Sequence, residues 1–499
     1  MKFIHQLKLV LLAGVVLIGA SSCDNGFTEL NVNPTQAAEM DPAFQLTRVE
    51  VTMSNSRYEY WRAQFIYTSC IIQHNASIFS YWSGDKYNLI DSYSSALWDR
   101  TWGREVKNLV DLMERTKEDP DQVNYNAAAT VLWVYVMARM TDLYGDMPYS
   151  EAGRGFIDGI LFPAYDSQAD IYNDMLAKLA EASGKFDASK AMTGDVLLGN
   201  DVAKWQKFAN SLRLRLGMRL SEVDAGKAET EVRAAIAGGV MESNDDEVVM
   251  FHSSLEQNGN SQVMQADDNF RLSETLINHL QATGDPRMMV WGMVYDADGT
   301  PNADPAAFIG LPNGTNSEDL EDGQYDTYVR HNRSTIKDVT APYFHQMYAE
   351  VEFLLAEAAV RGWGAEDAAG HFAAALRAGC EAAKKYPMAV VDDAAIDDFV
   401  ANNPLDASST EASLEHIANE YWVAHYLDGM EAFANWRRTG YPDLTPVDDP
   451  IGTTGGTIPR RLYYPPNEQA NNTANFEDAV SRQFGGTNDL TGRVWWDVQ

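Results

Sequence analysis

Cysteine is scarce in this chain: its 499 residues include three, Cys23, Cys70 and Cys380. So few cysteines exclude a disulfide framework, and a chain of this length can bury a core without one. Cys70 lies in an apolar stretch and Cys380 in an alanine-rich one, so we expect two buried free thiols rather than a disulfide. The absence of Cys-x-x-Cys and the presence of only nine histidines argue against a zinc site.

Positive charge is also in short supply. Lysine and arginine number 38 against 72 aspartate and glutamate residues, giving a net charge of −34. Such a surface repels nucleic acid, phosphorylated substrates and anionic lipid, so we expect none of these as partners. Neutral or cationic ligands remain.

Long apolar runs are absent except near the N-terminus. Lys2 and Lys8 precede a twelve-residue apolar run, residues 9–20, which is too short to span a bilayer. Small residues then lead into Cys23, the pattern of a secretory signal peptide that is cleaved before a lipidated cysteine. The alternative is an ordinary signal peptide in which Cys23 is incidental. We therefore predict a signal peptide at 1–22, a lipidated tether at 23–40 and one domain at 41–499, anchored by lipid alone.

Catalytic motifs are missing as well. The sequence has no Gly-x-Ser-x-Gly elbow, no Gly-Lys-Ser/Thr phosphate loop and no His-Glu-x-x-His. Asp142 and Asp146, one helical turn apart, are the best hydrolase candidates, but capping of a helix end and a turn is the favoured interpretation. We predict that the protein is not an enzyme and needs no cofactor.

Two polar clusters allow a ligand but favour a structural interpretation. Oxygen ligands suitable for calcium are grouped in one turn, but the spacing fails the helix-loop-helix pattern, so a solvated acidic turn is preferred. That turn contains Asp296, Asp298, Asn302 and Asp304. An arginine face at 213–219 could bind a carboxylate ligand, but ion pairing with acidic residues of neighbouring helices is the favoured interpretation.

Helical periodicity covers much of the chain and predicts a mostly α fold. The predicted helices are 45–73, 122–140, 166–179, 205–220, 343–362, 372–386 and 414–436. The pair joined by a glycine turn after residue 362 has about the length of a tetratricopeptide repeat, although its match to that consensus is loose. Residues 74–102, the irregular block 241–340 and the last sixty residues are predicted to be loops that carry function.

Aromatic residues in these loops are the candidate ligand contacts. A rigid ring stacks on the C–H faces of a sugar at low entropic cost, and it also serves peptides. Any single ring is more often core than ligand platform, but we expect each of two groups to contribute at least one ligand contact. The groups are Phe79, Tyr81, Trp82 and Tyr87 in the first loop, and Trp291, Tyr295, Tyr325 and Tyr328 in the irregular block.

A series of short motifs, in order along nearly the whole chain after Cys23, resembles the SusD/RagB family of nutrient-binding outer-membrane lipoproteins, in its SusD-like branch. The motifs are 30–34 (LNVNP), 142–152 (DLYGDMPYSEA), 163–166 (PAYD) with Gln168, 205–215 (WQKFANSLRLR), 285–287 (DPR), 310–314 (GLPNG), 348–358 (YAEVEFLLAEA) and 461–465 (RLYYP).

This resemblance implies a scaffold of tetratricopeptide-like helix pairs with long irregular ligand-facing loops. It implies a protein on the outer face of the outer membrane that captures glycans, or peptides in some members, and passes them to a SusC-type TonB-dependent transporter. The family motifs build the scaffold, so the candidate rings above come from inference and not from the family pattern. Peptide cargo, or a pure interaction scaffold with no small ligand, are the alternatives.

Overall fold

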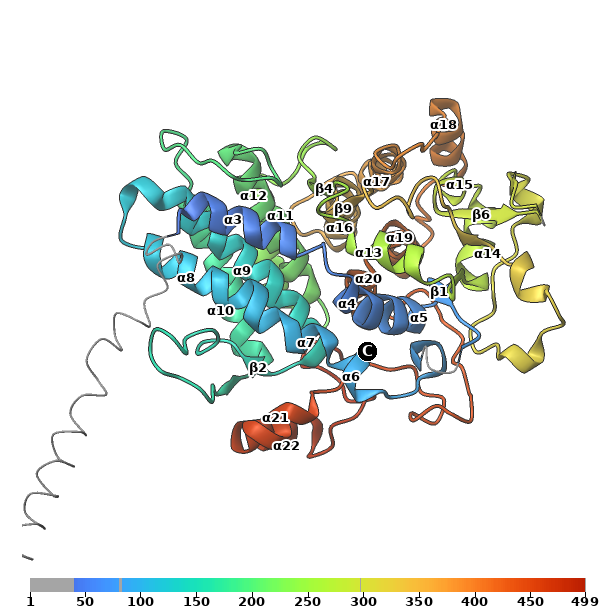
Figure 1. The fold of residues 1–499 in the computed structure, drawn as a ribbon. Helices are drawn as coiled ribbons and strands as arrows, with labels where there is room; N and C mark the ends of the chain where they lie inside the picture. The colour runs from blue at the N-terminus through green and yellow to red at the C-terminus, as the bar shows by residue number, and fades with distance from the viewer. Residues whose placement is uncertain (1–39, 80–82, 297, 499) are drawn as a thin grey trace, which may run out of the picture.

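The computed structural model describes residues 40–79, 83–296 and 298–498 (Figure 1). The predicted signal peptide, Cys23, nearly all of the tether, and the candidate rings Tyr81 and Trp82 lie outside these residues. The described part is mostly helical, as predicted. None of its helices combines the length and the apolar character needed to cross a membrane.

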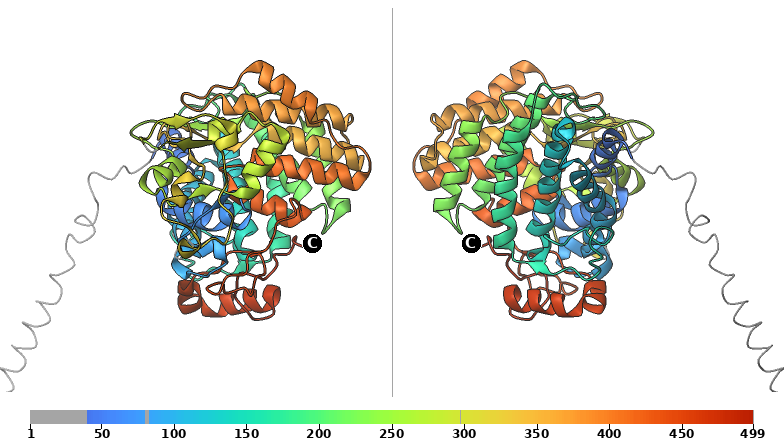
Figure 2. Two further views of the ribbon diagram at one scale, coloured as in Figure 1. Left: turned by 90° about the vertical axis from the view of Figure 1, so that its right-hand side faces the viewer. Right: turned by 90° about the vertical axis from the view of Figure 1, so that its left-hand side faces the viewer.

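Helix pairs build the first half of the molecule, and each helix packs mainly against the next along the chain. The right panel of Figure 2 shows several of them standing side by side. This arrangement confirms the tetratricopeptide-like scaffold. The helices are α3 (Pro42–Thr52), α8 (Lys107–Thr116), α9 (Val123–Tyr144), α10 (Gln168–Lys185), α11 (Val202–Arg219) and α12 (Ala225–Gly238).

The helix α9 lies at the centre of this layer. Its alanine-rich, apolar sequence is buried on almost every side, as expected for a helix enclosed by others. It ends at Gly145, whose φ of +88° is open to glycine but strained for other residues, and Pro148 follows three residues later. The predicted helix and its end are confirmed.

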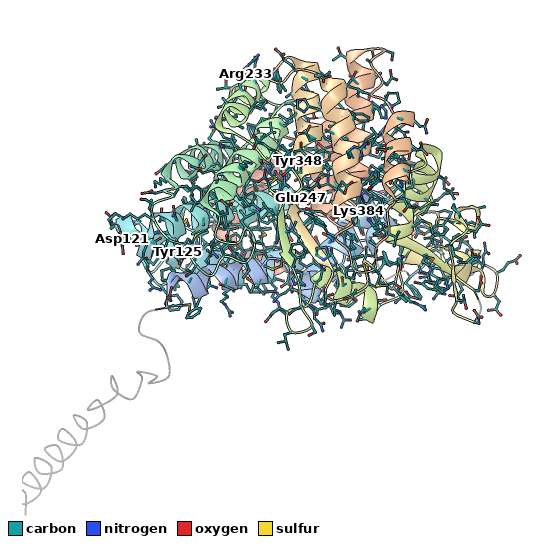
Figure 3. The ribbon with its side chains drawn as sticks, turned by 90° about the horizontal axis from the view of Figure 1, so that it is seen from above. Asp121, Tyr125, Arg233, Glu247, Tyr348 and Lys384 are labelled. Carbon is teal, nitrogen blue, oxygen red and sulfur yellow. The ribbon has the colours of Figure 1, made fainter. Side chains whose placement is uncertain are left out.

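A second set of helices covers the other half: α16 (Tyr348–Arg361), α17 (Ala368–Ala383), α18 (Asp393–Asn402), α19 (Thr410–Ala424) and α20 (Gly429–Thr439). The helices α16 and α17 form the predicted hairpin, and Gly362 closes α16 in the left-handed conformation. In Figure 3, Glu247 and Tyr348 lie close together where this set meets the first, and the Tyr348 amide donates to the Glu247 carboxylate at 3.2 Å.

Short elements fill the rest. The helical ones are α4 (Arg57–Glu59) and α5 (Ser69–Ile71), joined by a π-helical stretch at Tyr60–Thr68, then α6 (Asp91–Ser94), α7 (Ala96–Thr101), α13 (Gly259–Ala266), α14 (Glu274–Thr283), α15 (Met288–Trp291), α21 (Pro466–Asn471) and α22 (Thr473–Phe484). The strands pair antiparallel as β1 (Asn75–Ala76) with β5 (Arg271–Leu272), β2 (Met147–Pro148) with β3 (Tyr165–Asp166), β4 (Val248–Phe251) with β9 (Pro342–Gln346), and β6 (Gly292–Tyr295) with both β7 (Pro301–Asn302) and β8 (Arg330–His331).

Four predicted boundaries are wrong. The helix predicted at 45–73 is interrupted at residues 53–56, between α3 and α4, where the Ser54 carbonyl accepts the Gly259 amide at 2.8 Å. Residues 342–346 form strand β9 instead of the start of a helix, because they pair with β4. The single helix predicted at 414–436 is two, since Leu427 has a φ of +73° and its carbonyl accepts hydrogen bonds from Gln64 and Asn260 of distant helices. The last sixty residues include two helices, α21 and α22.

The prediction of an exposed aromatic loop at 74–102 is also partly wrong. From residue 91 the chain is helical, and Trp98 is 1% exposed. Its ring packs against Tyr144, Tyr165 and Tyr464, whose ring centroids lie 5.2–5.9 Å away. These partners come from distant parts of the chain, so the sequence around Trp98 alone does not reveal its burial. Cys70 and Cys380 are buried free thiols, as predicted.

Candidate ligand-binding site

Three loops that are far apart in the sequence meet around an open depression with a volume of about 330 Å³. This lies within the range of small-ligand sites. The loops follow β1, precede β8 and follow α20, on the right of Figure 1. Their lining residues are Ile78, Phe79, Asn316, Ser317, Glu318, Asp449, Pro450 and Ile451.

One ring from each predicted aromatic group lies in or beside this depression. Phe79 is half-buried and lines it, and the Tyr325 ring stands edge-on to Phe79 with the ring centroids 6.2 Å apart. The Arg271 guanidinium lies 3.8 Å from the centroid of the Tyr325 ring and holds it in place. The Tyr325 hydroxyl is buried and has no hydrogen-bond partner among the described residues. The pair places an aromatic face beside polar loop atoms.

A buried ion pair ties two of these loops together. Asp85 and Lys86 are fully buried, with the ammonium 3.1 Å from the carboxylate. The Lys86 ammonium also donates to the Ser77 carbonyl at 2.9 Å, and Asp85 accepts from the side chain of Asn313 and from the amide of Gly314. Burial raises the pKa of Asp85, although Lys86 and the two hydrogen bonds oppose that shift. The pair therefore fixes the segment that leads to Phe79 against the segment that leads to Asn316.

The third loop, which carries Asp449, is fixed by hydrogen bonds to Tyr87 and Asn316. Tyr87 is 1% exposed, its hydroxyl accepts from the Val447 amide at 3.2 Å, and its carbonyl accepts from the Thr453 amide at 3.0 Å. Burial raises the pKa of Tyr87 to about 12, so this hydroxyl stays protonated. Asn316 donates to Asp449 at 2.8 Å, which joins the second and third loops. Tyr87 thus positions the loop that carries Asp449 and presents no ring face to the solvent.

The other candidate rings lie elsewhere. Trp291 is buried against Tyr426, with ring centroids 4.9 Å apart, and Tyr328 is buried beside Ala76 and Leu311. Tyr295 lines a different depression of about 460 Å³, where its hydroxyl accepts from the Arg333 amide at 3.0 Å. The site residues absent from the sequence-based prediction are Ile78 and those at 316–318 and 449–451, because these loop residues carry no periodic or motif signal.

The carboxylates weighed as a hydrolase pair have structural roles. Asp142 is buried, where it accepts from the Trp496 indole N–H at 2.9 Å and from the Tyr172 hydroxyl. Asp146 accepts the Gln168 amide at the start of α10, at 2.8 Å, and pairs with Arg482. Burial raises the pKa of both aspartates. The preferred structural interpretation holds.

The arginine face has a structural role too, and the acidic turn forms local hydrogen bonds. Arg213, Arg215 and Arg219 pair with Glu231, Glu350 and Glu431. In the turn, Asp298 accepts the Thr300 amide and Asp304 the Ala306 amide, both as local turn hydrogen bonds. Across the described residues, no group of three or more His, Cys, Asp or Glu side chains could hold a metal ion.

These features define a helical-repeat scaffold with long loops, which place an aromatic pair beside amide, hydroxyl and carboxylate groups. The chain belongs to the SusD-like family: residues 34–465 match the family described as "Starch-binding associating with outer membrane". No curated protein is similar enough to match.

Solved structures agree with this assignment. A chitin-binding protein is 38% identical, with 92% of this chain and 100% of that one covered and a TM-score of 0.85. A chitin-binding SusD homolog from Flavobacterium johnsoniae is 27% identical, with 92% and 98% covered and a TM-score of 0.77. A SusD homolog from Bacteroides fragilis is 25% identical, with 91% and 99% covered and a TM-score of 0.78.

Proposed function

We propose that this protein is a lipoprotein of the outer membrane that faces the cell exterior, captures glycans and passes them to a SusC-type TonB-dependent transporter. The family description, with its starch binding and outer-membrane association, supports the location and the ligand class. The sequence before Cys23 supports the lipid anchor. The protein holds its cargo without changing it.

The observation that carries the proposal is the pairing of Phe79 with Tyr325 at the depression. The exposed part of the Phe79 ring stacks on the C–H face of a sugar ring, and Tyr325 supports it from the side. Asn316, Ser317 and Asp449 supply the donors and acceptors that sugar hydroxyl and amide groups require. Non-covalent capture needs no nucleophile or proton-transfer pair at this place.

Chitin oligosaccharides are the first ligand to test, because two similar solved structures are of chitin-binding proteins. The N-acetyl group combines an amide with a methyl group. The depression offers amide and hydroxyl groups at Asn316 and Ser317, and apolar surface at Ile78 and Ile451. An N-acetylglucosamine unit therefore fits this lining better than a plain glucose unit does.

The test is calorimetric titration of the purified body with chitohexaose, maltohexaose and a cationic peptide. Replacing Phe79 by alanine should weaken chitohexaose binding about tenfold, because a ring contact is worth about 0.5–1.5 kcal/mol beyond the apolar area it buries. Phe44→Ala is the matched control, since that ring is 72% exposed on α3, away from the depression. Equal chitohexaose affinity in both variants would contradict a binding site at Phe79. Binding of the peptide alone would favour the peptide alternative.

A further inference from the structure

The hairpin between β2 and β3 carries the most concentrated exposed apolar surface among the described residues. We call its tip, residues 154–163, the apolar loop. Phe156 is 87% exposed, Leu161 75%, Phe162 63% and Ile157 39%. Monomeric proteins rarely leave several large apolar side chains together in water unless the surface meets a partner or a membrane.

The backbone of this hairpin is held firmly. The Asp166 carboxylate accepts the amides of Tyr149 and Ser150 at 3.1 and 2.9 Å, which closes the base. On the far side, the Asn475 side chain donates to the carbonyls of Phe162 and Pro163 at 3.2 and 3.1 Å. The apolar side chains therefore project from a loop whose backbone is fixed by hydrogen bonds at both ends.

The apolar loop lies beside α8, and the far end of that helix contacts the point where the tether joins the body. The Lys107 ammonium, at the start of α8, is 4.6 Å from the centre of the Phe156 ring. Arg115, near the end of the same helix, donates to the Met40 carbonyl at 2.6 Å. Eight residues of helix separate these two positions, a rise of about 12 Å. In Figure 1 this side is on the left, opposite the loops around the depression.

The length of the tether restricts this side to the neighbourhood of the bilayer. Sixteen residues separate Cys23 from Met40. Even fully extended, the chain from Cys23 to Met40 reaches at most about 60 Å, so Met40 and the adjoining end of α8 cannot lie farther than that from a lipidated Cys23. The surface next to Met40 is therefore the one that the anchor keeps within a single tether length of the membrane.

We propose that the apolar loop inserts into the headgroup region of the bilayer as a second membrane contact beside the lipid anchor. This proposal rests on the lipid anchoring in the proposed function. Apolar side chains next to a cation such as Lys107 suit the boundary between headgroups and acyl chains. The net charge of −34 makes a zwitterionic surface the favoured one. A lipid anchor alone leaves the body free to turn, whereas the second contact directs the depression away from the membrane.

The first test places a nitroxide label at Leu161→Cys, with Met388→Cys as the control. Met388 is 82% exposed in the segment between α17 and α18, two helices that lie on the right of Figure 1, whereas α8 lies on the left. The native thiols Cys70 and Cys380 are 1% and 0% exposed, so they do not react. The lipidated protein is bound to vesicles of phosphatidylethanolamine and phosphatidylcholine, and collisions of the label with oxygen and with a water-soluble nickel complex are measured.

At position 161 the ratio of oxygen to nickel collisions should rise at least fivefold on vesicles, and at position 388 it should stay unchanged. Equal ratios at both positions would overturn the proposal. A rise at 161 that needs vesicles containing the transporter would overturn it too, in favour of a protein partner.

The second test separates the loop from the anchor. The Cys23→Ser protein, which cannot be lipidated, is floated with the same vesicles and compared with the same protein carrying Phe156→Ser, Leu161→Ser and Phe162→Ser. The bound fraction should fall at least fivefold in the triple variant, and an equal bound fraction would contradict the loop proposal whatever the state of the anchor. All three side chains are exposed, so an unchanged melting temperature checks that the variant folds.

Discussion

At the residue scale, buried ion pairs join helices that are distant in sequence. The Arg438 guanidinium on α20 donates to both carboxylate oxygens of Glu357 on α16, at 2.6 and 2.7 Å, and Arg361 adds a third bond at 2.9 Å. Burial by itself raises the pKa of Glu357, but the two arginines outweigh it and hold that pKa at about 2. A buried charge needs such partners, because its desolvation is costly.

The pH dependence of this pair follows from the lowered pKa of Glu357. The carboxyl has a pKa of 4.5 when unfolded and about 2 when folded, so its stabilisation is complete above pH 4.5 and is lost as the pH falls toward 2. Glu357→Gln should lower the free energy of unfolding by about 3–5 kcal/mol at pH 7, since it leaves Arg438 without its counter-charge. Urea denaturation should show this difference from the unmodified protein shrinking between pH 5 and pH 3.

Asp397→Asn is the control for that series. Asp397 pairs with Arg377 at the surface and its side chain is 65% exposed. A surface pair contributes about 1 kcal/mol or less, so the denaturation midpoint should hardly change. A Glu357→Gln difference that stays constant from pH 7 to pH 3 would show that the carboxylate is not the stabilising form.

At the element scale, glycines determine where helices end. Gly362 closes α16 with a φ of +74°, and a Cβ there meets no atom within 4 Å. Gly184 lies within the last turn of α10, is exposed, and a Cβ there also meets no atom within 4 Å. The two positions differ in backbone conformation and not in crowding.

Alanine should therefore act in opposite directions at these two positions. Gly362→Ala should cost about 1–2 kcal/mol, because the left-handed conformation is unfavourable for a residue with a Cβ. Gly184→Ala should add about 0.5–1 kcal/mol, because alanine loses less backbone freedom in a helix. Urea denaturation of both variants measures the difference, and a shift of the same sign in both would contradict this account.

At the scale of the whole molecule, the two ends of the body have different tasks. Met40 contacts the end of α8 through Arg115, and the loops that line the depression lie on the opposite side of Figure 1 from α8. Under the proposed function, a ligand site far from the anchor would stay accessible from outside the cell. The strong negative charge keeps the body apart from acidic surfaces and leaves neutral glycans free to approach.

Anchoring and ligand binding should accordingly be separable. Cys23→Ser should release most of the protein from the membrane fraction, because a protein without acyl chains loses its main contact with the bilayer. The released protein should bind chitohexaose with an unchanged Kd and keep the same helical circular dichroism signal. Full retention of Cys23→Ser in a salt-washed membrane fraction would contradict the lipid anchor.

Much of the scaffold could be predicted from sequence, because its signals are local. The enclosed helix α9 can be recognised from the alanine and other apolar residues on every side of it, and Gly145 and Pro148 mark its end. The break at Leu427 could not be predicted, since its cause is hydrogen bonds from Gln64 and Asn260, far away in the chain. The burial of Trp98 could not be predicted either, because its ring contacts come from tyrosines in distant parts of the chain.

The sequence by itself determined the net charge and the helical class, since these depend on composition and short-range periodicity. It also placed Phe79 and Tyr325 in two separate loops. Only the tertiary structure decided that these two rings meet while Tyr87 and Trp291 are buried. The physical reason is that a loop-built site depends on how rigid elements bring distant segments together, through contacts such as the Asp85–Lys86 pair.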